Sequence, residues 1–298
     1  MGAKVKNDFI YLGLRGLARA AGWLPTAWAR RTGAVLGGLF HDCVRRERDK
    51  TRRQLAAAFP ERTPEEIRRL GRRVFVNLGR AGMEFMRMRA LDASRVAAWV
   101  THVEGREHVT AALARGRGVV CLTGHFGNWE ILPVFTTVQG WPTSVVAQRL
   151  YDPRLDVLLN RARARHGIRV IQRGRVTAEI VRSLRENRLL GVLNDQDTGV
   201  DSRWAPFFGR PAKTPVGILR LARRTGSPVV PFFVVRLPSG GHAVHIEPAL
   251  DLPRTSDEES DLHQGAERCN AVIEAYVRRH PDHWVWFHER WKTTPPRS

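Results

Sequence analysis

From residue 99 onward, short apolar runs of strand length alternate with segments of helical period, and this alternation restricts the fold more than any other feature. The runs 119–122, 189–193 and 229–235 are almost continuously apolar, which is typical of strands buried on both faces. Further strands are expected at 99–103, 144–147, 169–171 and 242–246, and helices at 107–114, 155–165, 178–185, 216–223 and 258–279. The pattern predicts an α/β fold with a mixed, mostly parallel sheet flanked by helices.

The N-terminal third is predicted to be helical. Residues 8–40 are apolar on one side and carry Trp23 and Trp28, but arginines interrupt every window long enough to span a bilayer. This combination favours a helix lying in a membrane interface, and the basic run at 45–53 supports that reading. The alternative is a helix packed on the surface of the domain itself.

A long helix is expected at residues 63–91. Thr63 followed by Pro64 and two glutamates is a strong helix start, and the apolar residues after it keep a helical period. We expect one domain overall, with residues 1–95 as a helical, membrane-associating segment packed on an α/β core of residues 96–298.

The chain has 298 residues, of which 49 are Lys or Arg and 29 are Asp or Glu, for a net charge of +20. Such a surface favours polyanions, namely nucleic acid, anionic lipid head groups or an acidic carrier protein, although a GC-rich genome also enriches arginine. No zinc spacing, aromatic RNA signature or basic zipper is present, so we expect no nucleic-acid partner, and a basic nucleic-acid-binding protein is only a remote alternative. The three cysteines lie far apart and the histidines lack ligand spacing, which argues against disulfides and a metal site.

The first candidate site follows the apolar run 118–122. His125 and Glu130 lie between that run and a helical pattern at 131–138. Five steps along a regular helix or strand turn a side chain away from its starting direction, so the two side chains meet only where the backbone bends. In that arrangement the carboxylate accepts the proton of one imidazole nitrogen and leaves the other as a base. The alternative is a capping loop whose polar groups satisfy only the local backbone.

Glycines supply the flexibility for this bend. Gly124 and Gly127 flank the histidine, and Asn128 is expected to cap the helix that follows.

A second polar cluster, residues 194–200, follows the strand 189–193. Because strand exits of an α/β sheet gather at one edge, this cluster is a second candidate site; otherwise it is a polar cap on the sheet. An aromatic loop at 204–209 is expected to line a pocket or pack, and residues 211–215 are expected to start the next helix. The segment 284–292 mixes aromatic and cationic residues and is either a membrane contact or a strand under the site.

Three motifs occur in order along the chain: 124–130, then 195–197 with 206–209, then 284–292. Together they resemble the lipid A biosynthesis acyltransferase family, the late lauroyl and myristoyl transferases, and their lysophospholipid acyltransferase relatives. The resemblance covers nearly the whole chain. It implies a fold like that of glycerol-phosphate acyltransferases with an interfacial N-terminal helix.

The resemblance also implies roles for individual residues. His125 and Glu130 match the H-x4-D/E catalytic dyad, in which His125 deprotonates an acceptor hydroxyl and Glu130 holds the imidazole tautomer. The substrate hydroxyl is the nucleophile, and no G-x-S-x-G elbow is present. The oxyanion or substrate is expected to contact backbone amides of the bend and the side chains of Arg163, Arg149, Asn128, Asp195 and Gln196; Arg163 is preferred over Arg149, and Asp195 is expected to orient an arginine or the acceptor sugar.

The implied reaction needs no cofactor or metal, because acyl-carrier-protein thioester is a co-substrate. The implied partners are acyl carrier protein, a lipid acceptor and a membrane surface, and the implied location is the cytoplasmic face of the bacterial inner membrane. The acceptor is expected to be a lipid A precursor; a lysophospholipid or another glycolipid is the alternative, because the chemistry is identical.

Overall fold

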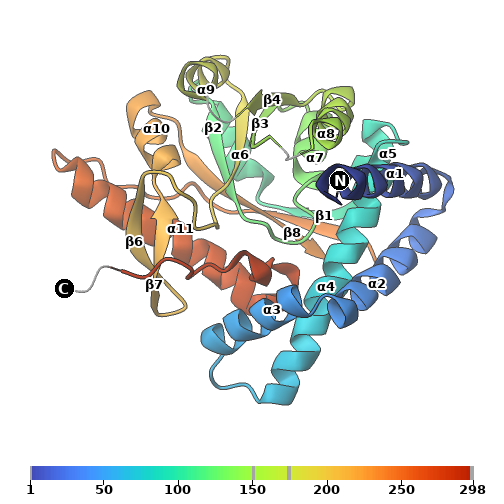
Figure 1. The fold of residues 1–298 in the computed structure, drawn as a ribbon. Coiled ribbons are helices and arrows are strands. Elements are labelled where there is room, and N and C mark those ends of the chain that lie inside the picture. Colours follow the sequence, from blue (N-terminus) through green and yellow to red (C-terminus); the bar gives the residue numbers. More distant parts are fainter. Residues whose placement is uncertain (1, 150–151, 173–175, 296–298) are drawn as a thin grey trace.

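The computed structural model describes residues 2–149, 152–172 and 176–295, and it is built around one seven-stranded sheet (Figure 1). The strands lie in the order β1-β9-β8-β2-β5-β3-β4. The five strands from β8 to β4 are mutually parallel, and β9 runs antiparallel to β8 and parallel to β1. The sheet strands are β1 (Val100–Glu104), β2 (Val119–Thr123), β3 (Thr143–Ala147), β4 (Arg169–Gln172), β5 (Leu189–Leu193), β8 (Val229–Arg236) and β9 (His242–Ile246).

Helices cover both faces of the sheet. They are α1 (Gly2–Trp23), α2 (Thr26–Cys43), α3 (Arg45–Ala58), α4 (Pro64–Met88), α5 (Ala93–Ala97), α6 (Arg106–Leu113), α7 (Ile131–Val138), α8 (Pro153–Arg165), α9 (Val176–Arg185), α10 (Gly217–Thr225) and α11 (Glu258–Arg279), with 3₁₀ turns at Pro281–His283 and Trp286–His288. The predicted α/β fold with a mixed, mostly parallel sheet is confirmed.

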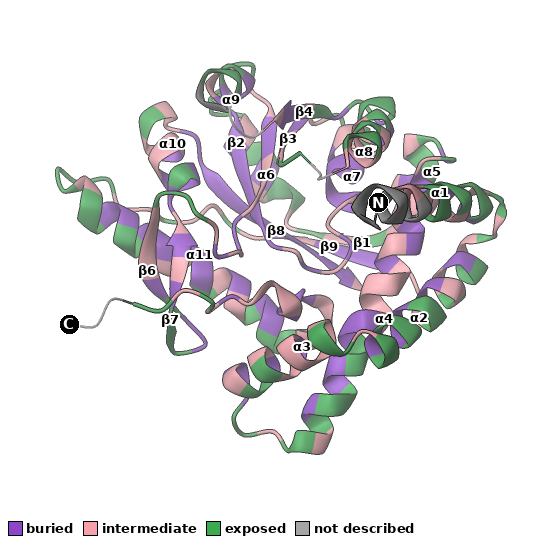
Figure 2. Ribbon diagram, viewed as in Figure 1, coloured by how far each residue is buried: buried purple, intermediate pink, exposed green. Residues whose placement is uncertain are grey.

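Strand β2 shows why its sequence is apolar throughout. Val119 and Cys121 face the core under α6 and α7, whereas Val120 and Leu122 face the larger core under α9, α10 and α11. A strand covered on both sides has no solvent face and therefore no alternation of apolar and polar residues. Figure 2 shows the central strands as buried and the outward sides of α2 and α11 as exposed.

The predicted strands and helices of the core are found within a few residues of their expected bounds. The expectation that residues 211–215 start a helix is wrong. They form strand β7 (Arg210–Pro215), which pairs antiparallel with β6 (Ser202–Phe207), and α10 begins only at Gly217. Pro206 and Pro211, which suggest a loop, are tolerated because a two-stranded ribbon leaves outward N–H positions unpaired.

The N-terminal helices pack on the core through α3, which contributes Leu55, and through α4, which contributes Leu70 and Val74. The expected start of this helix is confirmed, since Thr63 accepts from the backbone N–H of Glu66 and Glu66 bonds back to the N–H of Thr63. Helix α2 crosses α4 so closely that a Cβ on Gly79 would lie 2.0 Å from the carbonyl oxygen of Gly33. Among the described residues, no helix combines the length and apolarity required to cross a bilayer.

We predict that Gly79→Ala destabilises the protein by about 2 kcal/mol, because the added methyl group would force α2 away from α4. Gly82→Ala on the same helix is the matched control, since a Cβ there meets nothing within 4 Å. The control should be neutral or stabilise by roughly 0.5–1 kcal/mol. Denaturant unfolding of both variants measures the difference, and equal effects would contradict the close crossing.

Candidate active site

The site lies at the carboxyl edge of three neighbouring strands, β8, β2 and β5. The chain leaves β2 after Thr123 and leaves β5 after Leu193, and the backbone N–H of Asn194 donates to the carbonyl of Thr123. The two polar segments predicted from sequence are therefore brought side by side, as expected for strand exits in a parallel sheet.

The bend after β2 needs its glycines. Gly127 has φ of +61°, and a Cβ there would lie 2.0 Å from the carbonyl oxygen of Val234 on β8. A Cβ on Gly124 would lie 3.0 Å from a carboxylate oxygen of Asp195. Larger side chains would push the loop away from both neighbouring strands, so the predicted role of these glycines is confirmed.

His125 is held by Asp195. The ring Nδ1 lies 2.8 Å from Oδ1 of Asp195, and the backbone N–H of His125 donates to Oδ2 at 2.7 Å. The indole N–H of Trp284 donates to the same Oδ2 at 2.7 Å. A carboxylate beside Nδ1 favours the tautomer with its proton on that nitrogen, which leaves Nε2 as the basic nitrogen.

Asp195 is ionised although it is almost fully buried. Burial alone disfavours the charged form, but the charge of His125 and the hydrogen bonds from His125 and Trp284 outweigh it and hold the pKa well below its usual 3.8. The site therefore contains a fixed negative charge against the imidazole.

Glu130 meets Arg163 instead of the imidazole. Arg163 Nη2 donates to Oε1 of Glu130 at 2.6 Å and Nε donates to Oε2 at 3.2 Å, and no hydrogen bond or ion pair joins Glu130 to His125, both of which the structure describes. The contact expected between His125 and Glu130 is thus replaced by two separate pairs. The reason is that Glu130 occupies the residue just before α7, where its side chain is directed to α8.

Arg163 has a free donor. Its Nη1 is buried and has no hydrogen-bond partner in the described part of the chain. A buried N–H without an acceptor is costly, so such a group is a candidate for binding an anionic or developing negative oxygen.

A mainly apolar pocket adjoins these groups. Glu130 and Arg163 line it together with Trp129, and its walls come from α7 and from β2, β3 and β5. The ring of Trp129 also contacts the ring of His125, with centroids 5.1 Å apart. The apolar lining residues include Leu132, Pro133, Val145, Val146, Leu189, Val192, Leu193 and Phe232.

Gln196 and His288 complete the surroundings of the imidazole. The side-chain nitrogen of Gln196 lies 3.3 Å from both ring nitrogens of His125 and also contacts Nδ1 of His288. The ring of His288 lies 5.0 Å from that of His125, centroid to centroid. Sequence reasoning placed Gln196 in the site but missed His288, for which the only signal was a polar residue within the aromatic segment 284–292.

Asn128 and Arg149 are the two remaining residues predicted to contact the substrate, and their environments differ. The Asn128 side chain is only 2% exposed, and its amide donates to Glu84 at 2.8 Å. Its expected capping role is wrong, because α7 begins at Ile131 without a side-chain cap. Arg149 is exposed in the segment after β3.

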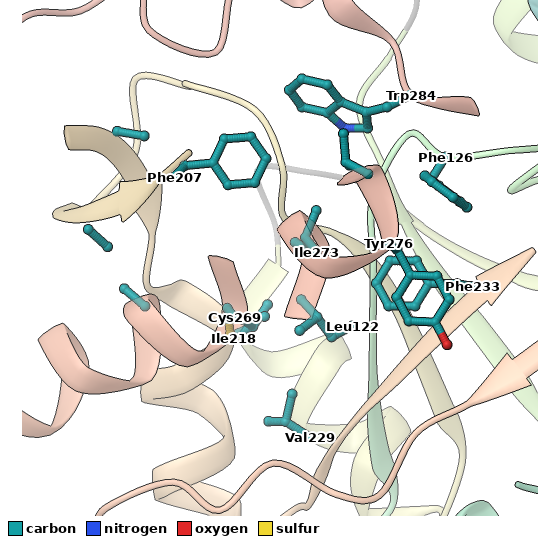
Figure 3. Close-up of a cluster of buried hydrophobic side chains, with 14 of the residues drawn as sticks. Leu122, Phe126, Phe207, Ile218, Val229, Phe233, Cys269, Ile273, Tyr276 and Trp284 are labelled. Carbon is teal, nitrogen blue, oxygen red and sulfur yellow. The ribbon is translucent and has the colours of Figure 1, made fainter. Parts of the chain in front are cut away.

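The C-terminal aromatic segment packs beneath the site. Trp284 and Trp286 are buried, and Trp284 contacts Phe207 with ring centroids 5.5 Å apart. Figure 3 shows Trp284, Phe207 and Phe126 in this region of the core with Leu122. The membrane-contact reading is therefore wrong for these two tryptophans. The alternative prediction, a strand under the site, is met within residues 284–292 by a single isolated bridge, which pairs Trp284 with Phe126.

Fold and site together define an α/β enzyme with a carboxylate-bound histidine beside an apolar pocket. The sequence model of the bacterial lipid A biosynthesis acyltransferases matches residues 4–293, and the chain belongs to that family. It is an acyltransferase.

Its relatives differ in the acceptor that their names give. The chain is 28% identical to the lipid A biosynthesis lauroyltransferase of Escherichia coli K12, over 91% of this chain and 88% of the relative. It is 30% identical to the phosphatidylinositol mannoside acyltransferase of Mycobacterium tuberculosis CDC 1551, over 72% of this chain and 67% of the relative.

We predict that His288 makes the protein less stable in mild acid. Burial first, and then the charge of His125, lower the pKa of His288 from its usual 6.5 to about 4. Between these values the unfolded chain binds the proton and the folded chain does not, so stability falls as the pH drops from 6.5 towards 4. His288→Asn should remove roughly 2 kcal/mol of the loss between pH 7 and pH 5.

Denaturant unfolding at the two pH values measures this difference for both proteins. An unchanged pH dependence in the variant would show that His288 is not held neutral in the fold.

Proposed function

We propose that this enzyme transfers a fatty acyl chain from an acyl-carrier-protein thioester to a hydroxyl group of a lipid A precursor or a related glycolipid. The observation that carries the proposal is the placement of His125, fixed by Asp195, next to an apolar pocket that Arg163 lines. Such a pocket suits an alkyl chain, and the two polar groups beside it suit the two charge changes of acyl transfer.

In the proposed step His125 is the general base. The acceptor hydroxyl gives its proton to Nε2 while its oxygen bonds to the thioester carbonyl carbon. Collapse of the tetrahedral intermediate re-forms the carbonyl and breaks the C–S bond. The imidazolium then returns the proton to the leaving thiolate. Asp195 stabilises the imidazolium and holds the ring, as the acid of a hydrolase triad does.

Arg163 is the proposed oxyanion donor. Two of its nitrogens are held by Glu130, and its buried Nη1 remains available. In this proposal Glu130 contributes to catalysis by fixing the guanidinium of Arg163. The H-x4-E spacing then means that one loop carries both the proposed base and the residue that holds the proposed oxyanion donor. Donors that are fixed before the reaction stabilise the transition state most, because they need no reorganisation.

The proposed donor and location are supported by the charge of the chain and by its N-terminal helices. A net charge of +20 complements an acidic carrier protein and anionic head groups. Helix α2 exposes Trp28, Val35 and Leu39 at 58%, 62% and 53%, positions that share one helix face, and Arg31 lies over the ring of Trp28. We propose peripheral attachment of this face to the cytoplasmic leaflet of the bacterial inner membrane, where a lipid acceptor is reached.

A second acceptor class is favoured by one comparison. The mycobacterial relative, at 30% identity, is named for a mannosylated phosphoinositide. Mass spectrometry of lipids from a deletion strain, with and without this chain restored, identifies the acceptor, because the missing acylated lipid returns only on restoration.

We predict that His125→Ala lowers kcat by about 10³-fold and that Asp195→Asn lowers it by roughly 10²–10⁴-fold, with little change in KM. The assay uses acyl-carrier-protein thioester, a lipid A precursor and product detection by mass spectrometry. Asp261→Asn, which alters another buried acid that pairs with Arg223, is the matched control and should stay near wild type. Near-normal transfer by His125→Ala would end the proposed mechanism.

Glu130→Gln and Arg163→Gln complete this experiment. Because the two side chains act as one pair, each change should lower kcat about 10²-fold. The kcat of the double variant should be no lower than that of the less active single variant. If the loss of kcat in the double variant instead equals the product of the two single losses, Glu130 acts independently of Arg163.

We predict that the double variant Val35→Glu and Leu39→Glu loses sedimentation with anionic phospholipid vesicles, because two charges then face the acyl chains. Val138→Glu, at an exposed valine on α7, is the control and should keep vesicle binding. Equal vesicle binding by wild type, the double variant and Val138→Glu would contradict attachment through α2.

A further inference from the structure

A buried glutamate lies on the other side of the catalytic loop from Asp195. Glu84 of α4 is completely buried and accepts two hydrogen bonds from Arg236 of β8, each 2.7 Å long. Arg30 of α2 donates to it at 2.5 Å, and His242 of β9 lies 3.2 Å from the same oxygen. Glu84 therefore joins two N-terminal helices to two strands of the sheet.

The charges around Glu84 keep it ionised. Burial opposes ionisation, but the hydrogen bonds from Arg236 and His242 and their charges outweigh it and hold the pKa well below its usual 4.5. Buried ion pairs of this kind often add little to stability compared with apolar packing, so stability alone is a weak reason for a charge at this position.

The fifth contact of Glu84 is the catalytic loop. Asn128 lies between His125 and Glu130 in the sequence, and its amide donates to Oε2 of Glu84. The same loop is held at Gly127, whose N–H donates to the carbonyl of His283, while Nε2 of His283 accepts from the backbone N–H of Arg236. Glu84 and its partners thus hold the loop on the β8 side, and Asp195 holds it on the β5 side.

We propose that Glu84 is a positioning residue for acyl transfer. Through Asn128 it fixes the loop on which His125 and Glu130 are mounted, so the base and the Arg163 donor keep their separation during the reaction. This inference rests on the proposed function. It assigns to α4, and through Arg30 to α2, a role in the geometry of the active site.

The test exchanges the acid and the amide. Asn128→Asp places a second carboxylate against Glu84 in a buried site and should lower kcat about 100-fold. Glu84→Gln removes the charge but keeps an acceptor oxygen, and should lower kcat roughly tenfold. The double variant again holds one carboxylate and one amide, with donor and acceptor reversed, and should recover to within about tenfold of wild type. KM for the acyl donor should stay within about twofold in all three, because the pocket is untouched.

Hydrogen exchange provides a readout that does not need the substrate. Exchange of the peptide covering residues 124–131 should be about tenfold faster in Asn128→Asp and in Glu84→Gln, and should return towards wild type in the double variant. Asp261→Asn is again the matched control: it weakens the buried pair with Arg223 at the start of α11 and should leave exchange of 124–131 unchanged.

The outcomes separate this inference from the proposed function. If wild type transfers no acyl group from any thioester donor, the proposed function fails and exchange of 124–131 still decides whether Glu84 holds the loop. Faster exchange with unchanged kcat overturns the positioning role. A double variant no better than Asn128→Asp overturns it too, and so does a Glu84→Gln protein that matches wild type in both measurements. Should Asn128→Asp fail to fold, Glu84→Gln alone decides by the same two measurements.

Discussion

The site depends on one carboxylate that receives three hydrogen bonds in the interior. Asp195 accepts from the ring and the backbone of His125 and from the indole of Trp284, so residues from three distant parts of the chain meet at two oxygens. The free-energy cost of desolvating this charge is offset by these hydrogen bonds and by the charge of His125, and the negative charge in turn fixes the imidazole. Parallel pairing of β2 and β5 makes the meeting possible, because it ends both strands at one edge.

On either side of this carboxylate the loop from Gly124 to Glu130 is held by contacts of different kinds. Asp195 binds His125 near its start, the Glu84 cluster binds Asn128, and Glu130 at its end binds Arg163. The glycines permit the approach, since Gly127 has no room for a side chain beside β8. A short segment outside the helices and strands thereby acquires defined positions for an imidazole and for the carboxylate that binds Arg163.

Much of this arrangement could be predicted from sequence, for reasons that particular residues show. The apolar run 119–122 has one stable environment, a strand covered on both faces, and the glycines after it indicate a bend. The polar residues after Leu193 indicated a second strand exit. The pairing of His125 with Asp195 instead of Glu130 was not predictable, because it depends on β2 and β5 being neighbours, and spacing along the chain carries no such information. The β6–β7 ribbon was missed because its prolines resemble those of a loop. The sequence does carry a signal for Glu84, which falls on the apolar stripe of α4 with Leu70, Val74 and Met88, where a charge needs partners.

The position of Trp284 in the sequence has a consequence for the order in which the site forms during synthesis. This residue, 89 positions after Asp195 in the sequence, supplies one of the three donors to Asp195, and its side chain belongs to the main core. Synthesis from the N-terminus therefore produces both His125 and Asp195 before the residue that supplies this donor. The last of the three donors to Asp195 can reach it only after Trp284 has been synthesised, so the site is completed after the strands β2 and β5 that position it.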